Sequence, residues 1–371
     1  MAKIIIIGSY APSLVNFRGD LIACMIDCGN EVIACAPDAS EEIVQELDGL
    51  GAEYTNIPLS RTGLNLFNDI RTFATLFILF RKVRPDVVLA YTIKPVIYGS
   101  IAAKVASIPA MYSMITGLGN IFVATGKKAK VIRFLVSILY RFSLATNRRI
   151  FFQNPDDLAE FRQRVLPGAT DKGVLINGSG INTSKFRVSE FPSTMRFLLI
   201  ARLLKDKGLF EYVRAASIIK NKYPGVKFDL VGPLDENPAC ISRAALEEWI
   251  DSGVIGYLGE LDDVRIAIAN ASVYVLPSYR EGTPRTVLEA MAMGRPIITT
   301  DAPGCRETVV DGENGFLVPT KSVDKLVGAM EKFILNPKLI ASMGKRSREI
   351  AEDKYDAHKV NQVILENMGL S

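Results

Sequence analysis

The sequence predicts an α/β protein of two domains, each built on a doubly wound parallel sheet. Its 371 residues exceed what one ordinary core holds and suit two domains of roughly 150 to 200 residues each. Short apolar runs rich in β-branched residues alternate with longer helical patterns along the whole chain. The alternation restarts near residue 195, after the polar segment 189–193, so we place the linker between the domains there.

The expected strands follow the apolar runs in chain order. In the first half they are residues 3–7, 31–36, 54–58, 87–91, 110–115, 149–152 and 174–176, and in the second half 196–201, 227–231, 254–258, 273–276, 296–299 and 315–318. Strands of this kind, separated by helices, indicate parallel sheets that are buried on both faces. The chain then has helical patterns at 323–335 and 337–368.

We therefore expect domains over residues 1–190 and 191–355, and a C-terminal helix within 356–371 that packs back on the first domain. Parallel sheets bind ligands beyond the carboxyl ends of their strands. Two such domains are expected to face each other across a cleft that holds the ligand.

The first half carries the basic character of the chain. The formal net charge is +4, and residues 87–155 contain nine Lys and Arg but no Asp or Glu. An anionic surface is a candidate partner, and the apolar residues between the bases favour membrane lipid over nucleic acid. A solvated helix face with a few phosphate-binding residues is the alternative interpretation.

The composition also limits the chemistry. His358 is the only histidine, and the five cysteines form no CxxC pair. Neither a Ser-His or Cys-His nucleophile pair nor a His-rich metal site is therefore expected. The apolar stretch 73–80 is too short to cross a bilayer, and the cysteine usage fits a cytoplasmic protein.

The strongest local motif is the segment 277–290, which follows the strand expected at 273–276 and opens a helix. Gly282 lets the backbone approach a ligand closely, and Pro284 suits the first helical turn. The free amides of that turn form an anion site. Glu281 precedes the helix and Glu289 lies within it, so one carboxylate can accept hydrogen bonds from sugar hydroxyls and the other from a ribose diol.

A second motif, residues 201–208, follows the strand expected at 196–201 and also opens a helix. Arg202 and Lys207 are placed to neutralise a diphosphate from two sides, and Gly208 eases the approach of the backbone. Ordinary surface bases at the start of a helix are the alternative. Both motifs lie at the carboxyl ends of strands in one domain, where a shared ligand is expected.

With these motifs the chain resembles the family 4 glycosyltransferases of the GT-B fold, which have two Rossmann-like domains facing across a cleft. The matching segments occur in the family's order and spacing at residues 179–182, 185–186, 201–208, 257–259, 276–294, 300–307 and 311–315. They cover most of the second half of the chain.

The resemblance implies that the second domain binds a nucleotide-sugar donor, with Arg202, Lys207 and Glu281 as catalytic residues. Glu281 would contact the transferred sugar and Glu289 the ribose, while Arg202 and Lys207 grip the diphosphate. Residues near the start of the helix would complete the cradle, namely Gly282, Thr283, Pro284 and Arg285. Transfer would retain the anomeric configuration, with no cofactor and no metal ion, because the positive side chains carry the leaving-group charge.

The first half resembles the family less closely. The loop after the first strand runs from Gly8 to Asn16 and Arg18, and Arg18 could contact a phosphate of the donor or the acceptor. A helix capped by Asn16 with a solvated Arg18 is the alternative. Many relatives carry a histidine near the reacting sugar, whereas this chain has Gly117 and Gly119 in that region, so the group that supports the leaving bond is open.

The acceptor is inferred from segment 126–149, a basic and strongly apolar helix that suits the headgroup region of an anionic membrane. Lys127, Lys128, Lys130 and Arg133 would face the membrane; a helix buried between the domains is the alternative. The resemblance extends to bacterial enzymes that lengthen undecaprenyl-diphosphate-linked sugars.

It implies a UDP-linked hexose or N-acetylhexosamine donor, a lipid-linked saccharide acceptor and a place on the cytoplasmic face of the inner membrane in lipopolysaccharide or O-antigen biosynthesis. A GT-B sugar-nucleotide epimerase and a non-catalytic nucleotide-sugar-binding subunit are the alternatives.

Overall fold

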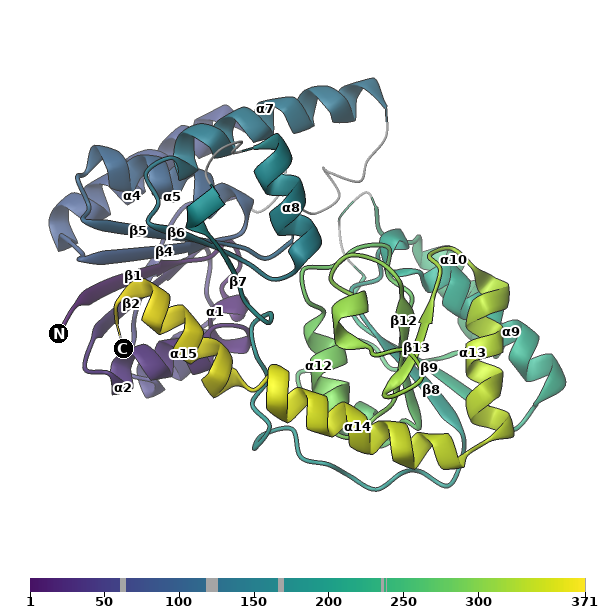
Figure 1. Cartoon of the computed structure of the whole chain (residues 1–371). Helices are drawn as coiled ribbons and strands as arrows, with labels where there is room; N and C mark the ends of the chain where they lie inside the picture. Colours follow the sequence, from purple (N-terminus) through teal and green to yellow (C-terminus); the bar gives the residue numbers. More distant parts are fainter. Residues whose placement is uncertain (61–64, 118–125, 166–169, 235–236, 238, 371) are drawn as a thin grey trace. The chain divides into compact units, whose positions relative to one another are not determined.

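The computed structural model describes the chain except residues 61–64, 118–125, 166–169, 235, 236, 238 and 371. The described residues form two compact units, the first made of residues 1–179 with 357–371 and the second of residues 180–356 (Figure 1). Each unit is a parallel sheet with helices on both faces. The predicted α/β class, with two doubly wound Rossmann-like sheets, is therefore confirmed.

All pairings in the sheet of the first unit are parallel. Its strands lie in the order β3 (Glu53–Asn56), β2 (Glu31–Ala36), β1 (Lys3–Ile7), β4 (Val87–Tyr91), β5 (Ala110–Ile115), β6 (Arg149–Phe152) and β7 (Gly173–Leu175). Ile5 of β1 pairs with Ile33 on one side and Val88 on the other.

Helices bury both faces of this sheet because side chains alternate along each strand. Ile5 and Ile7 pack in one core, and Ile4 and Ile6 pack in the other. The helices are α1 (Pro12–Asn16), α2 (Gly19–Asp27), α3 (Glu41–Gly49), α4 (Leu66–Val83), α5 (Ile93–Val105), α7 (Lys127–Leu144), α8 (Pro155–Arg164) and α15 (Ala357–Met368).

The C-terminal helix α15 belongs to the first unit, where it lies beside α2 (Figure 1). Its apolar side chains Val360, Ile364 and Leu365 join the core that contains Ile4 and Ile6. The hydroxyl of Tyr112 on β5 donates a hydrogen bond of 3.0 Å to the carbonyl of Met368 at the end of the helix.

The second unit repeats the plan with a six-stranded parallel sheet. Its strands lie in the order β10 (Gly256–Tyr257), β9 (Lys227–Val231), β8 (Arg196–Ile200), β11 (Val273–Leu276), β12 (Ile297–Thr300) and β13 (Gly315–Val318). Its helices are α9 (Leu209–Lys222), α10 (Arg243–Asp251), α11 (Arg265–Ala269), α12 (Arg285–Ala292), α13 (Val323–Leu335) and α14 (Lys338–Lys354).

The segment 189–193, where the sequence placed the linker, lies within the second unit. The fully buried guanidinium of Arg295 holds it there. This group donates hydrogen bonds to the carbonyls of Ser189, at 2.9 Å, and Glu190, at 2.9 Å, and lies 4.6 Å from the ring centroid of Phe191. The chain therefore enters the second unit at residue 180, whereas residue 191 was expected from the composition.

Candidate functional site

The two motifs meet at the point where the order of the second sheet reverses. Strands β8 and β11 are neighbours, and the chain leaves β8 toward β9 on one side but leaves β11 toward β12 on the other. The loops that follow them, 201–208 and 277–284, therefore lie together at the carboxyl ends of the strands, at the position where a doubly wound sheet usually has its ligand crevice.

Main-chain contacts join these loops. The carbonyl of Asp206 accepts hydrogen bonds from the backbone amide of Tyr279, at 2.9 Å, and from the hydroxyl of Ser278, at 3.2 Å. Gly208 has a φ of +73°, and a Cβ there would lie 2.1 Å from the carbonyl oxygen of Pro277. Only glycine therefore allows this approach of the two loops.

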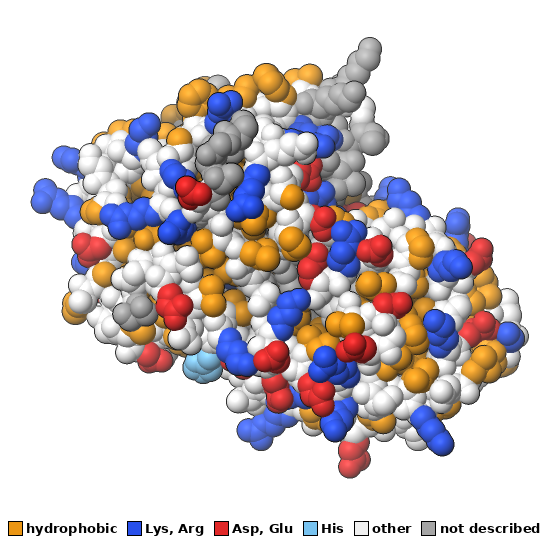
Figure 2. All heavy atoms as spheres, viewed as in Figure 1, with side chains coloured by type: hydrophobic (Ala, Val, Ile, Leu, Met, Phe, Trp, Pro, Cys, Tyr) orange, Lys and Arg blue, Asp and Glu red, His pale blue; other side chains and the backbone are white. Residues whose placement is uncertain are grey.

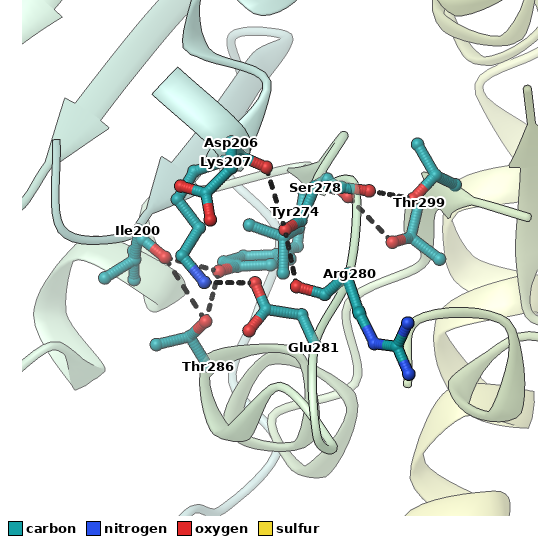
Figure 3. Close-up of polar contacts among 11 residues, drawn as sticks. Ile200, Asp206, Lys207, Tyr274, Ser278, Arg280, Glu281, Thr286 and Thr299 are labelled. Carbon is teal, nitrogen blue, oxygen red and sulfur yellow. Dashed lines mark hydrogen bonds and ion pairs between the residues drawn. The ribbon is translucent and has the colours of Figure 1, made fainter. Parts of the chain in front are cut away.

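The central side-chain contact is an ion pair between Lys207 and Glu281. The ammonium nitrogen lies 2.5 Å from a carboxylate oxygen, and each side chain is 15% exposed. In Figure 3 the two side chains point toward each other across the loops, whereas Arg280 points away. A partly desolvated cation and carboxylate thus lie at one end of the crevice, where water screens them less than it would at an open surface.

A third loop, which follows β12, contacts Glu281. The backbone amide of Glu281 donates a hydrogen bond of 2.9 Å to the carbonyl of Pro303 in this loop. Gly304, with a φ of +81°, follows, and a Cβ there would lie 2.2 Å from the carbonyl oxygen of Glu281. The motif analysis gave Gly304 no role, although a glycine after a strand and a proline is a signal for such a close approach.

The helix α12 starts one residue later than expected, with Pro284 as its N-cap and Arg285 as its first residue. Hydroxyl groups fix this first turn: Tyr274 of β11 donates to Thr286 at 2.6 Å, and Thr286 donates to the carbonyl of Ile200 at the end of β8 at 3.2 Å (Figure 3). Gly282 and Pro284 are buried and Thr283 is half-buried. The first turn is thereby tied to both strands of the crevice.

Glu289 lies one turn into this helix and is buried. Its carboxylate accepts a hydrogen bond of 3.1 Å from Arg285, whose guanidinium also donates to the carbonyl of Gly180 at 3.4 Å. Burial raises the pKa of Glu289 and outweighs the lowering by Arg285. The Glu289 carboxylate is thus a buried hydrogen-bond acceptor that a neutral diol can reach without adding charge to the site.

Arg202 is exposed at the start of the loop after β8. The structure brings Lys207 into direct contact with Glu281, and Arg285 with Glu289. The expected role of Arg202 in gripping a diphosphate stays a prediction.

In the first unit, the structure contradicts the alternative interpretation in which Asn16 caps a helix and Arg18 is solvated. Asn16 is the last residue of α1, so the alternative in which it caps a helix is wrong. Arg18 is only 2% exposed, its guanidinium lies 4.9 Å from the ring centroid of Tyr91, and it is therefore not solvated. A Cβ on Gly8 would lie 2.3 Å from the hydroxyl of Tyr91, so this loop also needs its glycine.

Gly117 lies two residues beyond β5 with a φ of +128°, and Gly119 lies outside the described residues. Lys127, Lys128 and Lys130 lie in the first turn of α7, where only the backbone is described. Arg133 is half-buried in the same helix. Exposed hydrophobic residues follow them along α7, namely Val131, Phe134, Leu135, Leu139 and Phe142.

Figure 2 shows hydrophobic side chains along the edge where α7 runs, with Lys and Arg side chains nearby. Among the described residues, no helix has the length and apolarity that a bilayer span requires. Nor does the described part of the chain bring three His, Cys, Asp or Glu side chains together as a metal site.

A crevice that offers cations beside carboxylates suits a ligand with a phosphate end and a hydroxyl-rich end. On a pair of doubly wound sheets, this is the donor chemistry of a glycosyltransferase. Family models agree: "Glycosyl transferases group 1" matches residues 182–350 and "Glycosyl transferase 4-like domain" matches residues 16–170. The chain belongs to this glycosyltransferase family.

Named relatives span nearly the whole chain. A Campylobacter jejuni protein named N,N'-diacetylbacillosaminyl-diphospho-undecaprenol alpha-1,3-N-acetylgalactosaminyltransferase is 31% identical over 95% of this chain and 94% of its own. An Escherichia coli protein named UDP-Gal:alpha-D-GlcNAc-diphosphoundecaprenol alpha-1,3-galactosyltransferase is 23% identical over 79% of this chain and 77% of its own.

Solved structures show the same fold. Anabaena HepE, crystallised with UDP, has a TM-score of 0.79 at 17% identity and covers 100% of both chains. Sucrose-phosphate synthase from Thermosynechococcus elongatus has a TM-score of 0.80 at 17% identity, over 99% of this chain and 98% of that one.

Proposed function

We propose that the chain is a retaining glycosyltransferase that moves a hexose or N-acetylhexosamine from a UDP-sugar to an undecaprenyl-diphosphate-linked saccharide during assembly of a bacterial surface glycan. The observation that carries the proposal is the Lys207–Glu281 pair at the switch point of the second sheet, at 2.5 Å. The names of the Campylobacter and Escherichia relatives support a diphosphoundecaprenol-linked acceptor, and the second supports a UDP-linked donor.

The donor would lie along the crevice with its diphosphate at Lys207 and Arg202. A diphosphate carries more negative charge than one carboxylate, so it can replace Glu281 as the partner of Lys207. Glu281 is then left to accept hydrogen bonds from the transferred sugar. Glu289 would accept from the ribose diol, and the backbone at residues 282–285 would complete the cradle.

Negative charge grows on the diphosphate as the bond from the anomeric carbon to its oxygen breaks. Lys207, Arg202 and the first turn of α12 would stabilise this charge, and hydroxyl contacts hold the first turn in place before the reaction begins. The acceptor hydroxyl forms the new bond on the face that the diphosphate leaves, and its proton passes to the departing phosphate. This gives retention with no cofactor, and we expect transfer to continue in the presence of EDTA.

The first test compares Lys207→Ala and Arg202→Ala with the matched control Lys205→Ala. Lys205 is exposed in the same short turn as Lys207 but contributes only its backbone to the contacts described. If the two cations stabilise the leaving group, turnover should fall on the order of 10²-fold in both variants and stay near wild type in the control. Wild-type turnover in both variants would remove the proposed role.

The assay supplies UDP-sugars and a lipid-diphosphate saccharide and looks for a saccharide one sugar longer. A longer product supports transfer. Isomerised donor without a longer product would indicate an epimerase, and donor binding with neither reaction would indicate a non-catalytic subunit. Either of these outcomes would overturn the proposed activity.

We also propose that α7 places the first unit on the cytoplasmic face of an anionic membrane. Exposed apolar side chains run along this helix, its first turn holds three lysines, and residues 87–155 contain no acid to oppose the attraction. Replacing Lys127, Lys128 and Lys130 with Glu should release the protein from anionic vesicles in a flotation assay. A control with Lys220→Glu, Lys222→Glu and Lys227→Glu in the second unit should still float, and equal flotation of both triple variants would contradict the proposal.

A further inference from the structure

Helix α12 begins with an arginine at a position where helices ordinarily favour an acid. Arg285 is the first residue of the helix, and the sequence of its first turn contains no Asp or Glu. The amide end of a helix carries partial positive charge, so a cation there is unfavourable. Arg285 also comes four residues before Glu289, which is the weaker order for an ion pair within a helix. The stability of the helix therefore does not account for this pair.

The arginine is held on two sides. Oε1 of Glu289 accepts a hydrogen bond of 3.1 Å from Nε of Arg285, and the two side chains are 10% and 15% exposed. Nη1 of Arg285 donates at 3.4 Å to the carbonyl of Gly180, where the chain enters the second unit. The guanidinium is thus fixed between its own helix and a separate segment, and it holds the Glu289 carboxylate in one orientation.

This contact leaves the Glu289 carboxylate able to bind a ligand. The hydrogen bond from Arg285 uses one of the roughly four acceptor positions of an ionised carboxylate. The other oxygen, Oε2, accepts no hydrogen bond from the residues that the structure describes. Both hydroxyls of a ribose diol can therefore donate to Glu289 while Arg285 stays bonded to Oε1.

Other charged or titratable groups near Glu289 do not replace Arg285. Lys185 and Asp263 affect the carboxylate in opposite directions, and both are exposed, so water and salt screen them. Burial raises the pKa of the Tyr274 hydroxyl on β11, which therefore stays neutral. Burial also raises the pKa of Glu289, and among the charges that oppose this effect Arg285 is the strongest.

We infer that Arg285 is a positioning residue of the proposed donor site, and that it holds the buried Glu289 carboxylate ready to accept the ribose diol of the nucleotide-sugar. The inference rests on the proposed function, in which Glu289 binds that diol. The charge of Arg285 also favours the ionised carboxylate, which is the form that accepts from both hydroxyls. In this role Arg285 acts through Glu289 on donor binding, whereas Lys207 acts on the charge of the leaving diphosphate.

The experiment measures the affinity for UDP by calorimetry over a pH series in the full-length protein with Arg285→Met. The matched control is Arg346→Met, because Arg346 is an arginine of the same unit that pairs with carboxylates at an exposed position. A second ligand, the 2′,3′-dideoxy analogue of UDP, keeps the base and the diphosphate but lacks the hydroxyls that would donate to Glu289. Steady-state transfer is measured in parallel to separate KM from kcat.

UDP affinity should fall about 10-fold at neutral pH in Arg285→Met, because Glu289 loses both its orientation and a favourable charge. The pH below which UDP binding weakens should rise, and Arg285→Lys, which keeps the charge, should return it toward wild type. Affinity for the dideoxy analogue should stay within about 2-fold of wild type, because it lacks the hydrogen bonds to Glu289. The donor KM should rise about 10-fold while kcat stays within about 2-fold. Arg346→Met should match wild type throughout.

A double variant tests whether Arg285 acts through Glu289. Adding Arg285→Met to Glu289→Gln should cause no further loss of UDP affinity, because two changes at one interaction are not additive. Additive losses would overturn the inference, and so would wild-type UDP affinity in Arg285→Met. An equal loss for UDP and its dideoxy analogue at every pH would also overturn it, since a merely structural role predicts that result.

Misfolding and failure of the donor site are separate outcomes. A variant that fails to fold would bind neither UDP nor the analogue, and Arg285→Gln then provides a milder loss of the charge, with the same expected difference between the two ligands. If wild-type protein binds no UDP, or binds UDP and the dideoxy analogue equally, the proposed donor site has itself failed. That result is seen before any variant is compared.

Discussion

Replacing Gly304 with alanine tests how the loop that carries Glu281 is held in place. Gly312 of the same chain provides the control. Gly304 and Gly312 both have a φ of +81°, so alanine carries the same backbone penalty at either position. They differ in their surroundings. Nothing lies within 4 Å of a Cβ on Gly312, whereas a Cβ on Gly304 would lie 2.2 Å from the carbonyl oxygen of Glu281 and 2.5 Å from that of Gly282.

The expected magnitudes follow from these distances. The left-handed backbone alone should cost each variant about 1 to 2 kcal/mol of unfolding free energy. At Gly304 the loop must also retreat by about 0.8 Å to reach a Cβ contact of 3.0 Å, which adds roughly 1 to 3 kcal/mol of overpacking strain. This retreat pulls the amide of Glu281 from the carbonyl of Pro303 and shifts the carboxylate that pairs with Lys207.

Urea unfolding and steady-state transfer assays read the two effects separately. A displacement near 1 Å at the reacting centre costs on the order of 10²-fold in rate, so Gly304→Ala should lose about that much turnover. Gly312→Ala should keep turnover within about 2-fold of wild type despite its lower stability. If both variants turn over equally, the contact between Gly304 and Glu281 does not position the Glu281 carboxylate for the reaction, and this explanation is refuted.

Two further predictions concern buried ionisable groups. Burial raises the pKa of Glu289 above its ordinary value of 4.5. In the proposed donor site the ionised carboxylate accepts both ribose hydroxyls, so UDP affinity should fall as the pH drops toward that raised pKa. Glu289→Gln should bind UDP weakly at every pH in calorimetry. Since the folded protein holds this proton more tightly than the unfolded chain, the same group removes stability as pH rises through that window. Arg295→Met should lower the unfolding free energy by about 3 kcal/mol or more, because the carbonyls of Ser189, Glu190 and Ile268 lose a charged donor. Urea titration measures this change. A loss under about 1 kcal/mol would show that segment 189–193 is held without Arg295.

The strand positions were predictable because burial on both faces leaves a direct mark on the sequence. An apolar run such as 3–7 is too short to form a helix of ordinary length, so a strand is the remaining assignment, and β1 has these bounds. The largest misplacements, at β3 and β10, fall on edge strands. Residues 254–258 shorten to β10, Gly256–Tyr257, because β9 is its only neighbour among the described strands and the ladder ends where that pairing ends. Apolarity predicts burial, but it does not predict the length of hydrogen-bonded pairing.

The site was predictable only as far as each loop could be read alone. Lys207 and Glu281 were both assigned to the ends of strands, but their contact joins residues 74 positions apart and depends on the order of the strands. Arg18 shows the same limit, because it is buried with its guanidinium over the ring of Tyr91, which lies on β4, far along the chain. A single sequence shows which groups reach an edge of the sheet, whereas the topology decides which of them meet.

In each unit, a lysine that follows a central strand of the sheet is paired with a carboxylate, and little of either side chain is exposed. Lys207 is held by Glu281 at 2.5 Å and Lys94 by Asp69 at 2.9 Å, and in both cases the carboxylate comes from a different element of the same unit. Burying an unpaired lysine at such depth would be costly, while a permanent buried pair would resist a ligand. One carboxylate offsets the cost of burial, yet a diphosphate, with more charge and more acceptor oxygens, can displace it. In the proposed donor site, the Lys207–Glu281 pair should therefore favour a multiply charged ligand over a single anion.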